Sequence, residues 1–170
     1  MGSMSEIALP PDVPGKLFRS PMPGRYRELS ADIEEIESAG IDLIVCLAEE
    51  EEIQRKSPEY LQWLRSYSQF FSIPPFPIAD YKAPDKERYS EYAKFIEQIA
   101  ESLLGGKRIL IHCGAGKGRT GMVAICVLMK LGLSLDEAIS NVRKAGAGPE
   151  VPKQWELIRR YEELLHTKKL

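Results

Sequence analysis

Short apolar runs alternate with longer amphipathic segments along this chain. Three of the runs, residues 15–20 (GKLFRS), 41–48 (IDLIVCLA) and 108–112 (RILIH), are rich in apolar and β-branched residues, which is typical of strands. The last two are apolar for most of their length, as expected for buried strands. We expect residues 15–20 to form an edge strand, and a further short strand near residues 70–73.

The segments between these runs have helical periodicity and helix end signals. Helices are expected at residues 30–40, with Ser30 as cap and Gly40 as stop, at 57–67, with Ser57 and Pro58 as a cap pair, at 86–104, and in three segments after the glycine-rich run at 112–121. Strands that alternate with helices predict an α/β fold with helices on both faces of a central sheet.

Composition limits the class of protein. The chain has 170 residues, of which 44% are hydrophobic and 28% charged, so we expect one soluble domain over residues 15–168 behind a flexible N-terminus at residues 1–14. The first four residues, MGSM, resemble the remnant of an expression tag. We expect a monomer.

Charge, hydropathy and cysteine content narrow the partners and the compartment. A net charge of −2 provides no basic field, so we expect no nucleic-acid partner. No apolar run is long enough to span a bilayer and no secretion signal opens the chain, so no membrane is expected. The three cysteines, Cys46, Cys113 and Cys126, form no disulfide framework, which favours a cytoplasmic protein.

The run HCGAGKGRTG at residues 112–121 carries the most specific chemistry. It places Cys113 at a strand-to-helix turn, where a helix N-terminus and a nearby cation favour the thiolate. Its glycines allow successive backbone N–H groups to surround an anion such as phosphate. The expected phosphate-binding residues are Gly114, Ala115, Gly116, Lys117, Gly118 and Arg119.

Two side chains at the end of this run complete the predicted loop. The planar guanidinium of Arg119 matches two phosphate oxygens, and the hydroxyl of Thr120 can donate to the sulfur of Cys113. A nucleotide P-loop is a poor alternative, because Gly118 stands where that motif needs Ser or Thr. A purely structural alternative, a buried cysteine in a glycine-rich turn, requires all of these features to coincide.

At these residues the chain resembles the cysteine-based protein tyrosine phosphatase superfamily, whose signature is His-Cys, five residues, Arg, then Ser or Thr. The resemblance implies a mainly parallel sheet between helices, a phosphocysteine intermediate on Cys113, phosphate held by Arg119, and neither metal nor cofactor. It also implies an aspartate on a separate loop as general acid. His112 belongs to the signature, and we expect it to orient the loop through hydrogen bonds.

Two aspartates are candidates for the acid. Asp80 follows an extended proline-rich stretch, and the segment PIAD resembles the acid loop of compact dual-specificity phosphatases, particularly the kinase-associated type. Asp85 directly precedes the helix at residues 86–104 and is better placed as its N-cap. We favour Asp80 and keep Asp85 as the alternative.

Other carboxylates and a second cysteine have open roles. Glu150 stands in a segment that resembles the superfamily's water-positioning loop, where many members carry glutamine; either Glu150 or Gln154 could orient the water, or Glu150 could be a solvated charge. For the acidic cluster at residues 49–52 we favour a solvated helix start over a loop that hydrogen-bonds the catalytic arginine. For Cys46 we favour core packing over oxidative pairing with Cys113.

The resemblance implies a phosphatase that acts on phosphotyrosine, and also phosphoserine or phosphothreonine, in a phosphorylated protein. A phosphoinositide or inositol phosphate phosphatase is the alternative, because AGKGRTG with Lys117 also resembles the tensin-type lipid phosphatases. A phospho-binding pseudophosphatase is a third possibility, against which Cys113, Arg119 and Asp80 argue.

Overall fold

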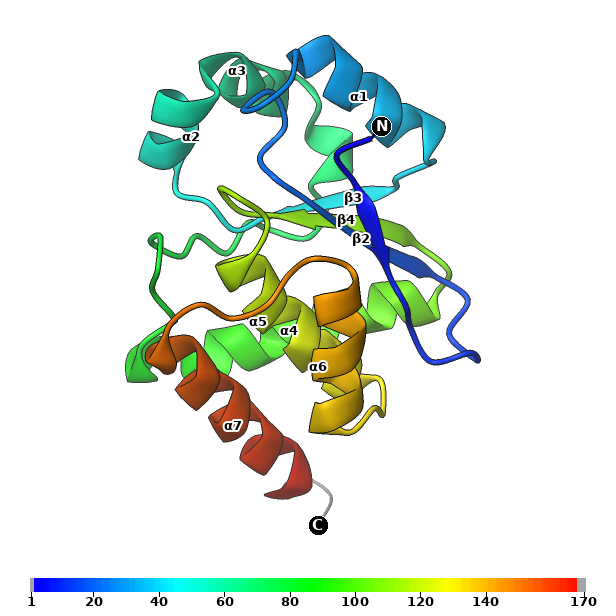
Figure 1. The fold of residues 1–170 in the computed structure, drawn as a ribbon, viewed down its shortest axis with the longest axis vertical. Helices are drawn as coiled ribbons and strands as arrows, with labels where there is room; N and C mark the ends of the chain where they lie inside the picture. Colours follow the sequence, from blue (N-terminus) through cyan, green and yellow to red (C-terminus); the bar gives the residue numbers. More distant parts are fainter. Residues whose placement is uncertain (1, 168–170) are drawn as a thin grey trace.

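A four-stranded sheet lies at the centre of the molecule (Figure 1). The computed structural model describes residues 2–167. The strands are β1 (Ser5–Ile7), β2 (Lys16–Ser20), β3 (Leu43–Cys46) and β4 (Arg108–His112), and their order in the sheet is β1-β2-β4-β3. Strands β2, β4 and β3 are parallel, and β1 is antiparallel to β2. The predicted α/β fold with a mainly parallel sheet is confirmed.

Helices cover both faces of this sheet, as predicted. Figure 1 shows α1, α2 and α3 on one side and α4 to α7 on the other. Their bounds are α1 (Leu29–Ser38), α2 (Glu50–Lys56), α3 (Pro58–Ser66), α4 (Tyr89–Leu104), α5 (Gly118–Lys130), α6 (Leu135–Lys144) and α7 (Pro152–Thr167), with short 3-10 turns η1 (Ser68–Phe70) and η2 (Lys86–Arg88).

The two layers follow from the alternation of side chains along each strand. On β4, Ile109 and Ile111 pack in the large core with α4 to α7, whereas Leu110 between them packs against Ile36 of α1 on the opposite face. Helix α5 is buried from Gly118 to Met129, which explains why its sequence is apolar all round. The strand and helix that flank the glycine-rich run are therefore both held on all sides by the core.

The expectation of a flexible N-terminus is wrong for part of residues 1–14. Ser5–Ile7 form β1, and Ile7 is completely buried. As a consequence β2 is not an edge strand, because it lies between β1 and β4. A three-residue strand has too few alternating positions to give a recognisable pattern in the sequence. Residue 168, the predicted end of the domain, lies outside the described residues.

Two local predictions also need correction. Residues 70–73 form no strand: a 3-10 turn ends at Phe70, and the two prolines that follow Ile73 have no N–H group to donate to a sheet. Ser30 does not cap the first helix, which begins at Leu29 with Glu28 in the cap position. The Ser57 and Pro58 pair does start α3, although the Ser57 hydroxyl donates to the carbonyl of Pro23.

Candidate active site

Cys113 follows β4 directly, and its sulfur lies close to the first turn of α5. The hydroxyl of Thr120, on the first turn of α5, donates to this sulfur over 3.1 Å. Cys113 is 2% exposed, but it lines a small cavity of about 180 Å³. Between the two elements, Gly116 has a φ of +75°, a left-handed conformation that glycine adopts without strain. The predicted loop geometry and the Thr120 contact are both present.

Arg119 connects the helix with two other segments. Its side chain, 2% exposed, donates to both carboxylate oxygens of Glu52 over 2.7 and 2.8 Å, to the carbonyl of Ile78 over 2.9 Å and to Asp80 over 3.0 Å. Burial alone would lower the pKa of Arg119, but the hydrogen bonds with Glu52 raise it above its ordinary value. The guanidinium therefore stays charged and fixed at the wall of the cavity.

The favoured interpretation of the acidic cluster at residues 49–52 is wrong for Glu52. The helix start is real, since α2 begins at Glu50, but Glu52 is buried against Arg119 and also accepts from Lys56 Nζ over 2.7 Å. Burial would raise the pKa of Glu52, and the hydrogen bonds from Arg119 and Lys56 outweigh it and hold the pKa at about 2. The position of the cluster at the carboxyl end of β3 was the signal for this contact.

Of the two candidate acids, the structure brings only Asp80 to the cavity. One carboxylate oxygen of Asp80 accepts from Arg119, and the other lies 3.5 Å from Lys56 Nζ. Asp85 occupies the cap position before η2, where its side chain makes no capping bond, and it does not line the cavity. The next residue after Asp80, Tyr81, has a φ of +60°, a strained conformation for a bulky side chain.

Glu150 and Gln154 both line the same cavity, and they are joined to each other. The Oε1 atom of Gln154 accepts from the backbone N–H of Glu150 over 2.8 Å, and its Nε2 donates to the carbonyl of Lys82 over 3.1 Å. Gln154 is buried, whereas Glu150 is exposed. Gln154 therefore ties the loop before α7 to the segment that follows Asp80.

A family model described as "PTP-SAK: Swiss Army Knife protein, DSP-PTPase phosphatase domain" matches residues 19–154. The match covers the catalytic loop, the Asp80 loop and Gln154, which are the segments that meet at the cavity. The chain belongs to this phosphatase family. The predicted relation to the cysteine-based phosphatases of dual-specificity type is confirmed.

Relatives of known structure support the fold of this phosphatase domain. The crystal structure of Tk-PTP in the active form has 30% identity and a TM-score of 0.67 and covers 94% of this chain and 97% of that one. Kinase associated phosphatase, with its catalytic-site cysteine replaced by serine, has 22% identity and a TM-score of 0.76 over 96% and 95%. Human cyclin-dependent kinase inhibitor 3 is 30% identical over 145 residues, 82% of this chain, which spans only 66% of that relative's length.

His112 sits behind the catalytic loop of the phosphatase domain and is completely buried. Its Nδ1 lies 3.1 Å from the carbonyl of Cys113, and its Nε2 lies 2.7 Å from the hydroxyl of Tyr60. Burial lowers the pKa of His112 to about 4, so the ring is neutral at physiological pH. Because a carbonyl can only accept, Nδ1 carries the proton and Nε2 accepts from Tyr60. This arrangement anchors the backbone at Cys113.

Three charged residues at or beside the site were not identified from the sequence: Arg25 and Lys56, which line the cavity, and Arg19, which contacts the loop after Cys113. Lys56 lines the cavity and contacts Glu52 and Asp80; its spacing of four residues from Glu52 on a helix was the available signal. Arg19, at the end of β2, gave no signal, because β2 was expected at the edge of the sheet. Conversely, the side chain of Lys117 is exposed and does not line the cavity.

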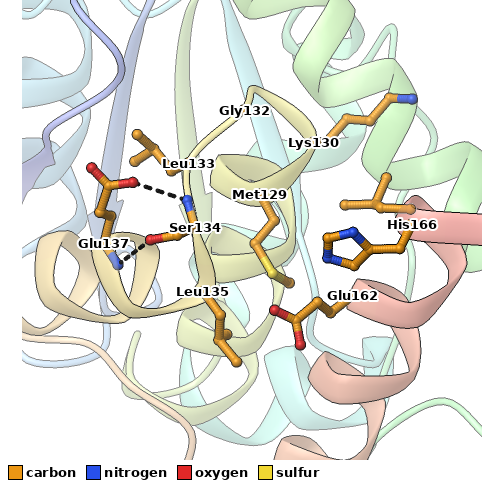
Figure 2. A pocket seen from close by; sticks show the side chains of 10 residues that line it. Met129, Lys130, Gly132, Leu133, Ser134, Leu135, Glu137, Glu162 and His166 are labelled. Carbon is orange, nitrogen blue, oxygen red and sulfur yellow. Dashed lines mark hydrogen bonds between the residues drawn. The ribbon is translucent and has the colours of Figure 1, made fainter. Parts of the chain in front are cut away.

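A second cavity, of about 580 Å³, lies between α5, α6 and α7 (Figure 2). It is lined by the last turn of α5, and the Ser134 and Glu137 side chains beside it form the capping box that starts α6. Helix α5, which has 13 residues and is therefore about 20 Å long, lies between this cavity and the loop that contains Cys113. Within residues 2–167 no cluster of side chains suits a metal ion, and no helix could span a membrane.

Proposed function

We propose that this chain hydrolyses phosphate monoesters, with phosphotyrosine in proteins as the main substrate, through a phosphocysteine intermediate. The observation that carries the proposal is the small cavity that Cys113, Arg119 and Asp80 share, with the hydroxyl of Thr120 on the sulfur. Nucleophile and phosphate ligand come from the loop that opens α5, the acid comes from a separate segment, and all three line this one space.

In the first step the phosphate group binds between the loop N–H groups and Arg119. The Cys113 thiolate attacks phosphorus, the bond from phosphorus to the ester oxygen breaks, and protonated Asp80 transfers its proton to that oxygen. Arg119 stabilises the negative charge on the other phosphate oxygens in the transition state. Since Asp80 contacts Arg119 in this structure, the incoming phosphate takes over that contact and leaves Asp80 facing the ester oxygen.

In the second step water cleaves the phosphocysteine. Asp80, now a carboxylate, accepts a proton from the water as its oxygen attacks phosphorus, and the bond from phosphorus to sulfur breaks. The Thr120 hydroxyl stabilises the departing thiolate, to which it already donates. Gln154 borders the same cavity and offers an amide to orient the water, with the neighbouring Glu150 as the alternative.

The rim of the cavity favours an aromatic ester. Two tyrosines that line it, Tyr26 and Tyr81, are 64% and 60% exposed, whereas most large apolar side chains of the chain are buried. Exposed aromatic rings beside a small polar cavity can stack on the ring of phosphotyrosine. Arg25 and Lys56 lie at the same rim, and their positive charges can bind the further phosphate groups of an inositol phosphate. An inositol phosphate is therefore the second candidate substrate.

The substrate class is tested by steady-state kinetics on three compounds: a phosphotyrosine peptide, a phosphothreonine peptide and an inositol polyphosphate. We expect the highest kcat/KM on the phosphotyrosine peptide, and a preference for the inositol compound would replace the leading proposal. Cys113→Ser should abolish turnover but keep substrate binding, because Arg119 and the loop amides remain. Binding without turnover in the unaltered protein would instead identify a pseudophosphatase.

A further inference from the structure

Arg19 is a buried cation that contacts the loop after Cys113 and is not among the residues that line the cavity. It lies on β2, which pairs with β4 in parallel register, Arg19 opposite Ile111. The residue is 8% exposed. Its Nε donates to the carbonyl of Gly116 over 2.9 Å, and its Nη2 donates to the carbonyl of Ala115 over 3.2 Å. Arg19 thus binds two consecutive carbonyls of the loop that follows the nucleophile.

These two bonds fix the orientation of two peptide planes. In a trans peptide the carbonyl and the N–H group of the next residue point in opposite directions, and the described chain has no cis peptide. When Arg19 holds the carbonyls of Ala115 and Gly116, the N–H groups of Gly116 and Lys117 must point away from it. The fork of an arginine can hold two acceptors in a fixed geometry, which a single point charge does less well.

The charge of Arg19 is not neutralised by a carboxylate. None of the ion pairs within residues 2–167 includes Arg19. By contrast, Arg119 and Lys56 both contact the carboxylates Glu52 and Asp80, so two positive charges face two negative ones. A buried charge is destabilised unless an opposite charge or hydrogen bonds compensate it. Burial lowers the pKa of Arg19, and the nearby sulfur of Cys113 acts in the opposite direction.

We propose that Arg19 is a positioning residue: it turns the loop N–H groups toward the phosphate and supplies the unpaired positive charge that favours the Cys113 thiolate. This role deepens the proposed phosphatase function and rests on it. The close packing of the loop on β2 agrees with it, since a side-chain carbon at Gly116 would collide with the carbonyl oxygen of Ser20 and lie 2.6 Å from Arg19 Nη2.

Arg108 offers a matched control. It lies on β4 of the same sheet, and its Nε also donates to a backbone carbonyl, that of Ala39, over 2.7 Å. However, Arg108 is the first residue of β4, at the end of the strand remote from Cys113. Replacing either arginine by methionine removes a guanidinium that binds backbone, but only Arg19→Met removes one from the catalytic loop.

The first readout is the pH at which Cys113 becomes half-maximally reactive to iodoacetamide, followed by peptide mass spectrometry. We expect Arg19→Met to raise this midpoint by about one pH unit, and Arg108→Met to leave it unchanged. The other charged groups at the cavity or next to the nucleophile are the same in every variant: Arg25, Glu52, Lys56, Asp80, His112, Arg119 and Glu150. A shift that differs between the two variants therefore reports on Arg19.

The second readout is the affinity for orthovanadate, an oxyanion that probes the loop amides. We expect Arg19→Met to weaken binding about 10- to 100-fold. Arg19→Lys keeps the positive charge but not the planar guanidinium. Its alkylation midpoint should therefore stay close to that of the unaltered protein, whereas most of the vanadate affinity should be lost. This variant also serves if Arg19→Met fails to fold, as judged by circular dichroism.

Equal midpoint shifts in the Arg19→Met and Arg108→Met variants, or no shift in the former, would overturn the role in thiolate formation. Unchanged vanadate affinity in Arg19→Lys would overturn the role in loop geometry. Alkylation requires no turnover, so a chain that shows the Arg19 effect but hydrolyses no phosphate ester would refute the proposed function and leave the role of Arg19 intact.

Discussion

At the scale of single residues, the site depends on which groups Arg119 and Asp80 contact. Arg119 binds Glu52, Asp80 and a backbone carbonyl at once, so its position is fixed before any phosphate arrives. Asp80, in contrast, is half-exposed, and its carboxylate contacts Arg119, Lys56 and the backbone N–H of Tyr81. Arg119 is therefore held more firmly than Asp80, which suits the roles of phosphate ligand and acid that we propose for them.

Replacing Asp80 tests its role as acid. We expect Asp80→Asn to lower kcat on a phosphotyrosine peptide by about 100-fold or more, because the leaving oxygen then departs without a proton. The matched control is Asp85→Asn, five positions along the chain, which should keep the activity of the unaltered protein. Adding Glu150→Gln to Asp80→Asn shows whether Glu150 supplies the remaining activity. A large loss of kcat in Asp85→Asn, with little loss in Asp80→Asn, would instead identify Asp85 as the acid.

Replacing Glu52 tests the buried ion pair. Glu52→Gln leaves Arg119 without its bidentate partner and should reduce the free energy of unfolding at pH 7 by about 3 kcal/mol. The carboxyl has a pKa of about 2 in the folded protein, below its ordinary value of 4.5. Its contribution is therefore complete above about pH 5 and is lost as the pH falls toward 2.

The measurement is urea denaturation of Glu52→Gln and the unaltered protein across this pH range, where the difference between the two should shrink with falling pH. Glu50→Gln on the same helix is the control, because Glu50 and Arg65 form an exposed pair. A difference that stays constant with pH would show that Glu52 is not held as a carboxylate by Arg119.

At the scale of elements, the strand β4, the catalytic loop and helix α5 form one unit that packs against the end of β2. The carbonyl of Gly114 accepts from the N–H of Met22, and Arg19 binds the next two carbonyls. The loop is thus attached along its outer side to the segment that includes β2. This attachment leaves no room for a side chain at Gly116.

Gly116→Ala tests the attachment. The φ of +75° and the collision with the carbonyl of Ser20 both oppose the substitution, and we expect a loss of kcat/KM of about 100-fold or more because the loop must shift. Gly40→Ala is the control: Gly40 has a similar φ of +67°, but an added carbon there meets only Arg108 at ordinary distances. Both variants should lose about 1 kcal/mol of stability from backbone strain, and Gly40→Ala should remain fully active.

At the scale of the whole molecule, the sheet and its two helix layers separate the three cysteines by environment. Cys46 on β3 and Cys126 on α5 are buried in the core, and burial raises the pKa of each thiol to about 12. Cys113 lines the cavity that Arg119 and Asp80 share, whereas Cys46, 3% exposed, borders a different and mainly apolar cavity. The predicted core packing of Cys46 is confirmed, and its oxidative pairing with Cys113 stays a prediction.

This separation predicts selective labelling. With pKa values near 12, only about one part in ten thousand of each buried thiol is ionised at pH 8. Iodoacetamide should therefore modify the native protein once, at Cys113, and the urea-unfolded protein at all three cysteines. Intact mass and peptide mapping check both counts. Labelling of Cys46 in the native protein would contradict its burial.

The sequence by itself determined the elements with strong periodicity and the contacts within a few residues. The loop from His112 to Thr120, the helices on both sides of the sheet and the two candidate acids could all be predicted, because their signals lie in adjacent residues. β1 could not, since three residues have too short a pattern, and without β1 the strand β2 was expected at the edge.

Only the tertiary structure decided which charges meet. Glu52 lies 67 positions from Arg119, and Arg19 lies 97 positions from Gly116. No local pattern distinguishes a buried glutamate that holds an arginine from its exposed neighbours Glu50 and Glu51, because the difference arises when the carboxyl ends of β2, β3 and β4 come together at one edge of the sheet. The same convergence places Asp80, rather than Asp85, at the cavity that Cys113 lines.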